Sequence, residues 1–158
     1  MLDNHNDKLN ILSIPLRDLV PHSEPMVLLD SIVEFNDNSL LAEFNVTENS
    51  RFYDASCQGI ESWVGIEYMA QAIAALAGIR AKLSGEEVKL GFLLGTRKMN
   101  ISVPILAVGN RYQVYIEELY MDDSGLGAFN CTIRHNDSVV SDAKLNVFET
   151  SDSSQLKP

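Results

Sequence analysis

The segment that most constrains the fold is residues 63–79, WVGIEYMAQAIAALAGI, which is apolar except for Glu67 and Gln71. Its length and composition predict a helix that is buried on nearly every side. Glu67 and Gln71 are four positions apart, so a helix places them on one face. An ionised carboxylate held out of water is costly unless it is paired, protonated or bound to a metal. Glu67 is therefore the first candidate for a functional residue.

The composition fits a single domain. The chain has 158 residues, 46% of them apolar, which is enough for a sizeable core. Its formal net charge of -10 argues against nucleic acid and an anionic membrane surface as partners. The apolar segment is shorter than the roughly 20 residues of a membrane span, and the polar N-terminus has no signal-peptide core, so a cytoplasmic location is expected. Cys57 and Cys131 lack metal-ligand spacing, and no metal site is predicted.

The order of the expected elements indicates the fold class. Polar, aperiodic ends predict loose tails over residues 1–10 and 150–158 around one domain over residues 11–149. A hairpin, one helix and a series of antiparallel strands indicate an α+β fold. A helix that is apolar almost all round needs a curved antiparallel sheet wrapped around it, which is the hotdog fold. Turn residues separate the strands expected at 25–35, 40–46, 88–94, 99–105, 111–121, 126–135 and 139–149.

Two motifs resemble those of a known family. Residues 19–32, LVPHSEPMVLLDSI, are similar to the LPHRxPFLLVDR opening of the FabZ-like 3-hydroxyacyl-acyl-carrier-protein dehydratases, and residues 65–78, GIEYMAQAIAALAG, resemble their EAMAQ helix. With residues 91–99 and 145–149, they are most similar to the ApeP-like subgroup encoded with aryl-polyene and related polyketide pathways. The resemblance implies that Glu67 is the catalytic acid residue and that Gln71 accompanies it. It also implies a homodimer or higher oligomer with the site between subunits.

The sequence departs from the family at the second catalytic residue. Family members of the fatty-acid type carry a His in a GHFPGxPxxPG segment, fourteen positions before the Glu, where this chain has Tyr53. Dehydration needs a base for the proton beside the carbonyl. The candidates for this base are His22, whose side chain suits proton transfer near neutral pH, Tyr53, and Asp54 in the loop where the family His would lie. Packing of His22 and solvation of Asp54 are the alternative interpretations.

The sequence also offers candidates for the catalytic acid, for the donors to the enolate oxygen and for the lining of the acyl tunnel. A carboxyl shielded from water tends to hold its proton, so Glu67 is expected to donate it to the leaving hydroxyl, unless it is a structural carboxyl hydrogen-bonded to Gln71. The backbone N–H groups of Val64 and Gly65, at the start of the helix, are candidates to stabilise an enolate oxygen, although Gly65 also fits close helix packing. Aromatic side chains are expected to line the acyl tunnel or to belong to the core. The residues are Phe52, Tyr53, Trp63 and Tyr68.

A local excess of basic residues suggests a docking surface for acyl carrier protein. Between Ile79 and Lys98 there are five basic and two acidic residues on a chain that is otherwise acidic. An acidic carrier protein would be attracted there and repelled elsewhere. Cations near a helix C-terminus also complement its dipole, and this is the alternative explanation for Arg80 and Lys82. The expected docking residues are Arg80, Lys82, Arg97 and Lys98.

The leading hypothesis is therefore a hotdog dehydratase that acts on a 3-hydroxyacyl chain carried on the phosphopantetheine of acyl carrier protein. No cofactor or metal is expected. A hotdog thioesterase, in which an acidic residue activates water, is the second hypothesis. The third is a non-catalytic subunit that binds carrier protein or a second dehydratase subunit, because the family His is missing.

Overall fold

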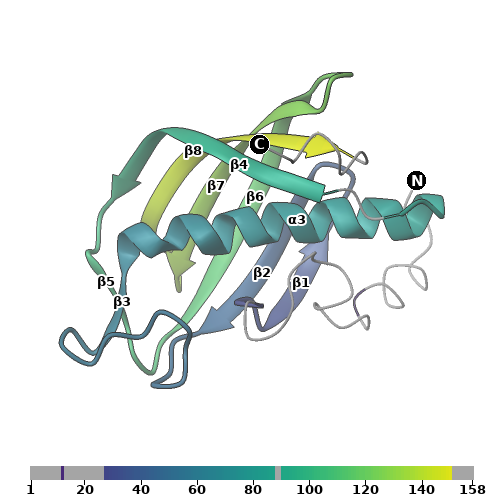
Figure 1. Ribbon diagram of the computed structural model, residues 1–158. Helices are drawn as coiled ribbons and strands as arrows, with labels where there is room; N and C mark the ends of the chain where they lie inside the picture. Colours follow the sequence, from purple (N-terminus) through teal and green to yellow (C-terminus); the bar gives the residue numbers. More distant parts are fainter. Residues whose placement is uncertain (1–11, 13–26, 88–89, 151–158) are drawn as a thin grey trace.

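The computed structural model describes Leu12, residues 27–87 and residues 90–150. Within these ranges a single long helix lies among eight strands and one short 3-10 helix (Figure 1). The elements in chain order are β1 Ser31–Phe35, β2 Ser39–Asn45, β3 Gly59–Glu61, η1 Ser62–Val64, α3 Gly65–Ser84, β4 Leu90–Ile101, β5 Ile105–Ala107, β6 Arg111–Met121, β7 Leu126–His135 and β8 Ser138–Thr150.

The strands form one curved antiparallel sheet and one small one. The larger sheet has the order β1-β2-β6-β7-β8-β4, and β3 pairs with β5 in the smaller sheet. Figure 1 shows α3 running lengthwise across the concave face of the larger sheet. The helix packs on β2, β6, β7 and β8. The predicted α+β hotdog architecture is therefore confirmed.

Helix α3 supplies the centre of the core. Met69, Ala72 and Ala75 have no exposed surface, and the helix together with η1 is long and apolar enough for a membrane span. However, 67% of its most apolar window is buried inside the fold, as expected for a core helix. The helix ends where Gly85 adopts a left-handed conformation with φ of 72° and donates its N–H to the carbonyls of Ala81 and Lys82.

The sheet turns one face to this helix and the other outward. In β6, Tyr112, Val114 and Ile116 are buried, whereas the side chains between them point away from the helix. This alternation follows from the two-residue period of a strand, and it allows one face to be apolar. The strands predicted at 111–121 and 126–135 match β6 and β7, and 139–149 lies within β8.

Two expectations about strands were wrong. The segments 88–94 and 99–105 do not form two strands, because β4 continues from Leu90 to Ile101 through irregularities at Leu93/Gly95 and Thr96/Lys98. Such bulges take up an extra residue without ending the strand. No strand was expected between residues 46 and 63, but β3 lies directly before η1 and its three residues pair with β5.

Strand β4 lies at an edge of the larger sheet. Among the described residues it pairs with β8 alone, so its other side presents backbone groups along its length. Leu94 and Ile101 in this strand are 58% and 44% exposed. A long edge strand with exposed apolar side chains is a surface on which another chain can pair.

Candidate active site

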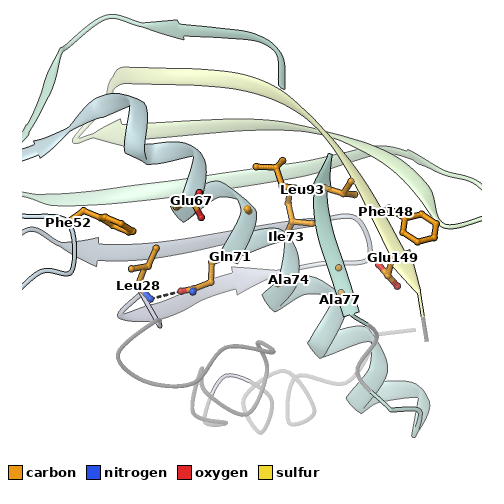
Figure 2. A pocket seen from close by; sticks show the side chains of 13 residues that line it. Leu28, Phe52, Glu67, Gln71, Ile73, Ala74, Ala77, Leu93, Phe148 and Glu149 are labelled. Atoms are coloured by element: carbon orange, nitrogen blue, oxygen red, sulfur yellow. Dashed lines mark hydrogen bonds between the residues drawn. The ribbon is translucent and has the colours of Figure 1, made fainter. Parts of the chain in front are cut away.

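A groove runs along one side of α3, between the helix and strands β4 and β8 (Figure 2). Its volume is about 290 Å³, and most of its lining is apolar. The helix contributes a row of small side chains, which leaves room beside it. The residues that line the groove are Leu28, Phe52, Glu67, Ala70, Gln71, Ile73, Ala74, Ala77, Gly91, Leu93, Val147, Phe148 and Glu149.

Glu67 lies in the first turn of α3 and on the wall of this groove. Its side chain is exposed in the single chain, and no hydrogen bond or ion pair to it occurs within the described residues. The expectation that Glu67 is shielded from water is therefore wrong for the single chain. The reason is that the sheet wraps around the other sides of α3 and leaves the face with Glu67, Ala70, Ala74 and Ala77 partly open.

Gln71 is one helical turn further on, but it points into the fold. Its side chain is 3% exposed, and its Oε1 accepts hydrogen bonds from the backbone N–H groups of Leu28 at 2.6 Å and Leu29 at 3.1 Å. Figure 2 shows the first of these bonds. Gln71 thus fixes the segment that carries Leu28, one wall of the groove, while Glu67 faces the open space.

The start of α3 does not fit the predicted oxyanion site. Val64 and Gly65 are buried and do not line the groove, and the N–H of Gly65 already donates to the carbonyls of Ser62 and Trp63. A Cβ on Gly65 would come within 2.7 Å of the Ile133 Cδ1 atom. Gly65 therefore serves the close packing of α3 against β7, which is the alternative considered from the sequence.

Of the aromatic residues expected to line a tunnel, Phe52 does so. Trp63 is 59% exposed outside the groove, where its Nε1 donates to Glu61 at 2.7 Å. Tyr68 is buried in the core and stacks on Phe44 with ring centroids 4.0 Å apart. Burial, followed by the charge of Asp30, raises the pKa of Tyr68 to about 12.

Neither Asp54 nor Tyr53, two of the three candidates for the general base, lines the groove. Asp54 is exposed and outside the groove, and its Oδ1 accepts hydrogen bonds from the N–H of Ser56 at 2.9 Å and from the Ser56 hydroxyl at 2.6 Å. These bonds lower the pKa of Asp54, which makes it a weaker base. Tyr53 is half-buried and does not line the groove either. His22 lies outside the described residues.

The predicted docking residues separate into two groups. Arg80 donates to both carboxylate oxygens of Glu118, at 2.9 and 3.4 Å, and to the carbonyl of Asp37 at 2.5 and 3.1 Å. It therefore ties α3 to β6 and to the turn between β1 and β2. Lys82, Arg97 and Lys98 are exposed.

Several groove residues were not singled out from the sequence. Ala70, Ala74 and Ala77 could have been found, because they follow Glu67 at the spacing of one helical face. The groove residues of β4 and β8 lie within the family-like segments 91–99 and 145–149, but no pattern there marked them as part of a groove, since their approach to α3 depends on the curvature of the sheet. No group of three or more His, Cys, Asp or Glu that could hold a metal occurs in the parts of the chain that the structure describes.

Known proteins share this sequence and fold. The 3-hydroxyacyl-[acyl-carrier-protein] dehydratase FabZ of Acinetobacter baylyi is 26% identical over 136 residues, covering 84% of this chain and 90% of that protein. FabZ of Chlamydia trachomatis is 30% identical over 95 residues, 57% of this chain and 61% of that protein. The structure of the dehydratase heterocomplex ApeI:P from Xenorhabdus doucetiae matches with a TM-score of 0.84 and 28% identity, over 90% of this chain and 95% of that chain.

The match to a family is broader still. Residues 14–157 match the ApeP-like family, whose members are described as ApeP dehydratases. That range includes the groove, α3 and every strand of the larger sheet. The acidic residue at the start of a buried helix, on the wall of an apolar groove, is consistent with this assignment. The chain belongs to the ApeP-like family of dehydratases.

Proposed function

We propose that the chain removes water from a 3-hydroxyacyl group carried on acyl carrier protein, in aryl-polyene or related specialised fatty-acid and polyketide assembly. A base takes a proton from C2 of the acyl chain, the C2=C3 double bond forms, and the C3–O bond breaks. The Glu67 carboxyl gives its proton to the departing hydroxyl, which leaves as water. The elimination requires no redox cofactor, because carbon is neither oxidised nor reduced overall.

The observation that carries this proposal is the position of Glu67 at the head of the groove. Ala70, Ala74 and Ala77 follow it along α3, so an acyl chain with its C3 hydroxyl at Glu67 can lie beside these small side chains. At 1.5 Å per residue, the groove extends about 15 Å from Glu67 to Ala77. A carboxyl at one end of an apolar groove is the arrangement that dehydration of a long acyl thioester needs.

A second subunit completes the site in this proposal. Glu67 is open to solvent, and the described residues place no second acid or base beside it. Strand β4, which forms one wall of the groove, has an unpaired edge among the described residues. A partner that pairs with this edge would cover Glu67, exclude water and bring the missing base. The ApeI:P assembly is a dehydratase heterocomplex, which supports a different hotdog subunit as this partner.

Glu67→Gln tests the chemistry. The glutamine keeps the size of the side chain but cannot donate a carboxyl proton, so formation of 2-enoyl-acyl carrier protein should fall by about a hundredfold to ten-thousandfold. The protein should remain folded, because Glu67 makes no described hydrogen bond. Glu86→Gln, at an exposed position after α3, is the matched control and should keep full activity.

The same assay separates the alternatives. The chain alone and the chain with a second hotdog subunit are compared, with enoyl product and free thiol both measured. We expect enoyl product mainly from the complex. Full activity of a complex that carries Glu67→Gln would show a non-catalytic subunit, and free thiol without enoyl product would show a thioesterase.

A further inference from the structure

A second cavity, the polar hollow, adjoins the segment that carries Leu28. Its volume is about 300 Å³, which is enough for a small molecule. Leu28 lines both cavities, but Glu67 does not line the hollow, so the hollow is a neighbour of the groove with a lining of its own. The polar side chains in that lining include Asp30, Asn45, Thr47, Asn49, Arg51 and Tyr68.

Tyr68 brings a buried hydroxyl to the polar hollow. The residue is 2% exposed, its ring stacks on Phe44, and no hydrogen bond to its hydroxyl occurs within the described residues. Burial, followed by the charge of Asp30, raises the pKa of Tyr68, so the phenol lies toward Asp30 and keeps its proton. A buried donor without an acceptor is unfavourable. The Tyr68 hydroxyl is therefore available to donate to a molecule in the hollow.

Two opposite charges line the polar hollow without pairing with each other. The Oδ2 atom of Asp30 accepts hydrogen bonds from the backbone N–H of Asn45 at 2.7 Å and from its Nδ2 atom at 3.1 Å. The Oδ1 atom of Asp30 accepts none from the described part of the chain. Arg51 is exposed and makes no ion pair or hydrogen bond with any described residue. The hollow thus offers a free carboxylate oxygen and a free guanidinium group.

The loop that carries Arg51 is held in place by its own hydrogen bonds. The N–H of Thr47 donates to the Ser50 hydroxyl at 2.9 Å, and the N–H of Asn49 donates to the Thr47 hydroxyl at 3.1 Å. The Ser50 hydroxyl donates to the carbonyl of Asn45 at 3.4 Å. Because this wall is already formed, little of it has to be ordered when a ligand binds.

The free groups of the hollow determine which ligand they suit. A guanidinium group holds a carboxylate through two parallel N–H donors, and a carboxylate oxygen accepts from an ammonium group. A ligand with a single charge would be attracted by Arg51 or Asp30 and repelled by the other. A ligand that carries both charges close together satisfies both side chains.

We propose that the polar hollow binds a small zwitterion of the α-amino-acid type, whose carboxylate accepts from Arg51 and Tyr68 and whose ammonium group donates to Asp30. The site is separate from the groove that contains Glu67. Its occupation does not depend on the proposed dehydratase function.

Calorimetric titration of the full chain with each free α-amino acid at neutral pH tests this proposal. For the amino acid that binds most tightly, the N-acetyl form lacks the cation and the amide form lacks the carboxylate. Each of these should bind at least about tenfold more weakly, as expected when a hydrogen bond to a charged group is lost. Binding of no amino acid, or equal binding of either derivative, would overturn the proposal.

Variants show whether the ligand occupies the polar hollow. Arg51→Gln and Asp30→Asn should weaken binding by about tenfold to a hundredfold, and Tyr68→Phe by about tenfold. Arg134→Gln and Tyr115→Phe, at exposed positions outside the hollow, are the matched controls and should bind as the wild type does.

Arg51 and Tyr68 make no described hydrogen bond, so their variants should stay folded even where Asp30→Asn, which weakens the contact with Asn45, does not. Wild-type affinity in both Arg51→Gln and Tyr68→Phe would overturn the site.

Glu67→Gln separates the polar hollow from the groove. This variant should bind the amino acid as tightly as the wild type, because Glu67 does not line the hollow. Loss of binding in Glu67→Gln would place the ligand in the groove and overturn the proposed site. These titrations measure no turnover, so a failure of the dehydratase assay would leave their result unchanged.

Discussion

The side-chain carbonyl of Gln71 accepts the backbone N–H of Leu28 at 2.6 Å, and this contact joins α3 to the segment before β1. The neighbouring N–H of Leu29 donates to the same oxygen at 3.1 Å. Leu28 in turn lines the groove that begins at Glu67. Gln71 therefore lines the groove itself, and through the backbone of another segment it also holds Leu28 in place.

Gln71→Leu should destabilise the protein and loosen substrate binding. The substitution leaves two N–H groups without their acceptor at a site where Gln71 is 3% exposed. The free energy of unfolding should fall by about 2–4 kcal/mol, because each unsatisfied buried donor costs roughly 1–3 kcal/mol. Chemical denaturation measures this loss, and KM should rise more than kcat falls because the wall at Leu28 is displaced.

Gln71→Glu is the matched variant, since its carboxylate can accept both N–H groups. It should recover stability and the low KM best at mildly acid pH, where the carboxyl takes up a proton and no charge is buried. Equal loss in both variants would show that the amide nitrogen of Gln71, and not its carbonyl, holds the structure in place.

The sequence allowed prediction of those elements whose signals are local. Strands β6 and β7 alternate apolar and polar residues between turn residues, so their bounds followed from the pattern. Strand β3 has three residues and pairs with β5 more than forty positions along the chain, so no local pattern marks it. Strand β4 looked like two strands because bulges interrupt its alternation.

The candidate site was predictable only in part, for a similar reason. Glu67 is conspicuous in an apolar helix, but the helix is apolar on almost every side, so its sequence does not show which face the sheet leaves open. Glu67 and Gln71 were expected to share one environment, whereas one is exposed and the other is buried. Glu149 was not expected, because the pairing of β4 with β8 brings it to α3.

Arg80 should contribute to stability and not to carrier-protein binding. It bridges Glu118 and the Asp37 carbonyl in a partly exposed position, so Arg80→Met should lower the free energy of unfolding by about 1 kcal/mol. The KM for a substrate on acyl carrier protein should stay the same. A raised KM in a variant that remains folded would show that Arg80 does bind acyl carrier protein.

Charge reversal at Arg97 and Lys98 should weaken the docking of acyl carrier protein. Both side chains are exposed on the edge strand β4, and an acidic partner would be attracted to them. Arg97→Glu and Lys98→Glu should raise KM for the carrier-bound substrate, most strongly at low salt. A thioester on free pantetheine is the control, because its KM should not change. An equal rise in KM for both substrates would show that Arg97 and Lys98 affect binding of the acyl thioester and not docking of the carrier protein.

Asp54→Asn should leave activity intact and remove a pH-dependent contribution to stability. Hydrogen bonds from the hydroxyl and N–H of Ser56 lower the pKa of Asp54 below its ordinary value of 3.8. The folded state therefore binds this proton more weakly, so the contribution is present above about pH 4 and is lost as the pH falls through the lowered pKa. Unfolding measured from pH 7 down to pH 2 should show wild type and variant converging at acid pH. Loss of dehydration in a folded Asp54→Asn would identify Asp54 as the base.

Tyr68 should make the protein sensitive to alkaline pH. Burial raises its pKa from 10.0 to about 12, so the folded state holds the phenolic proton more tightly than the unfolded state. The stabilisation is complete below pH 10 and is lost as the pH rises through 12, and two pKa units correspond to about 3 kcal/mol. Tyr68→Phe keeps the ring that stacks on Phe44 and cannot ionise, so its stability should decline less between pH 10 and 12.

Burial raises the pKa of Cys131 from 9.0 to about 12, so its thiol contributes to the alkaline loss of stability in the same direction as Tyr68. Urea unfolding of Cys131→Ala across this pH range separates the contribution of the thiol from that of the phenol. Identical alkaline profiles for wild type and Tyr68→Phe would show that the phenol of Tyr68 ionises as readily in the folded protein as in the unfolded chain.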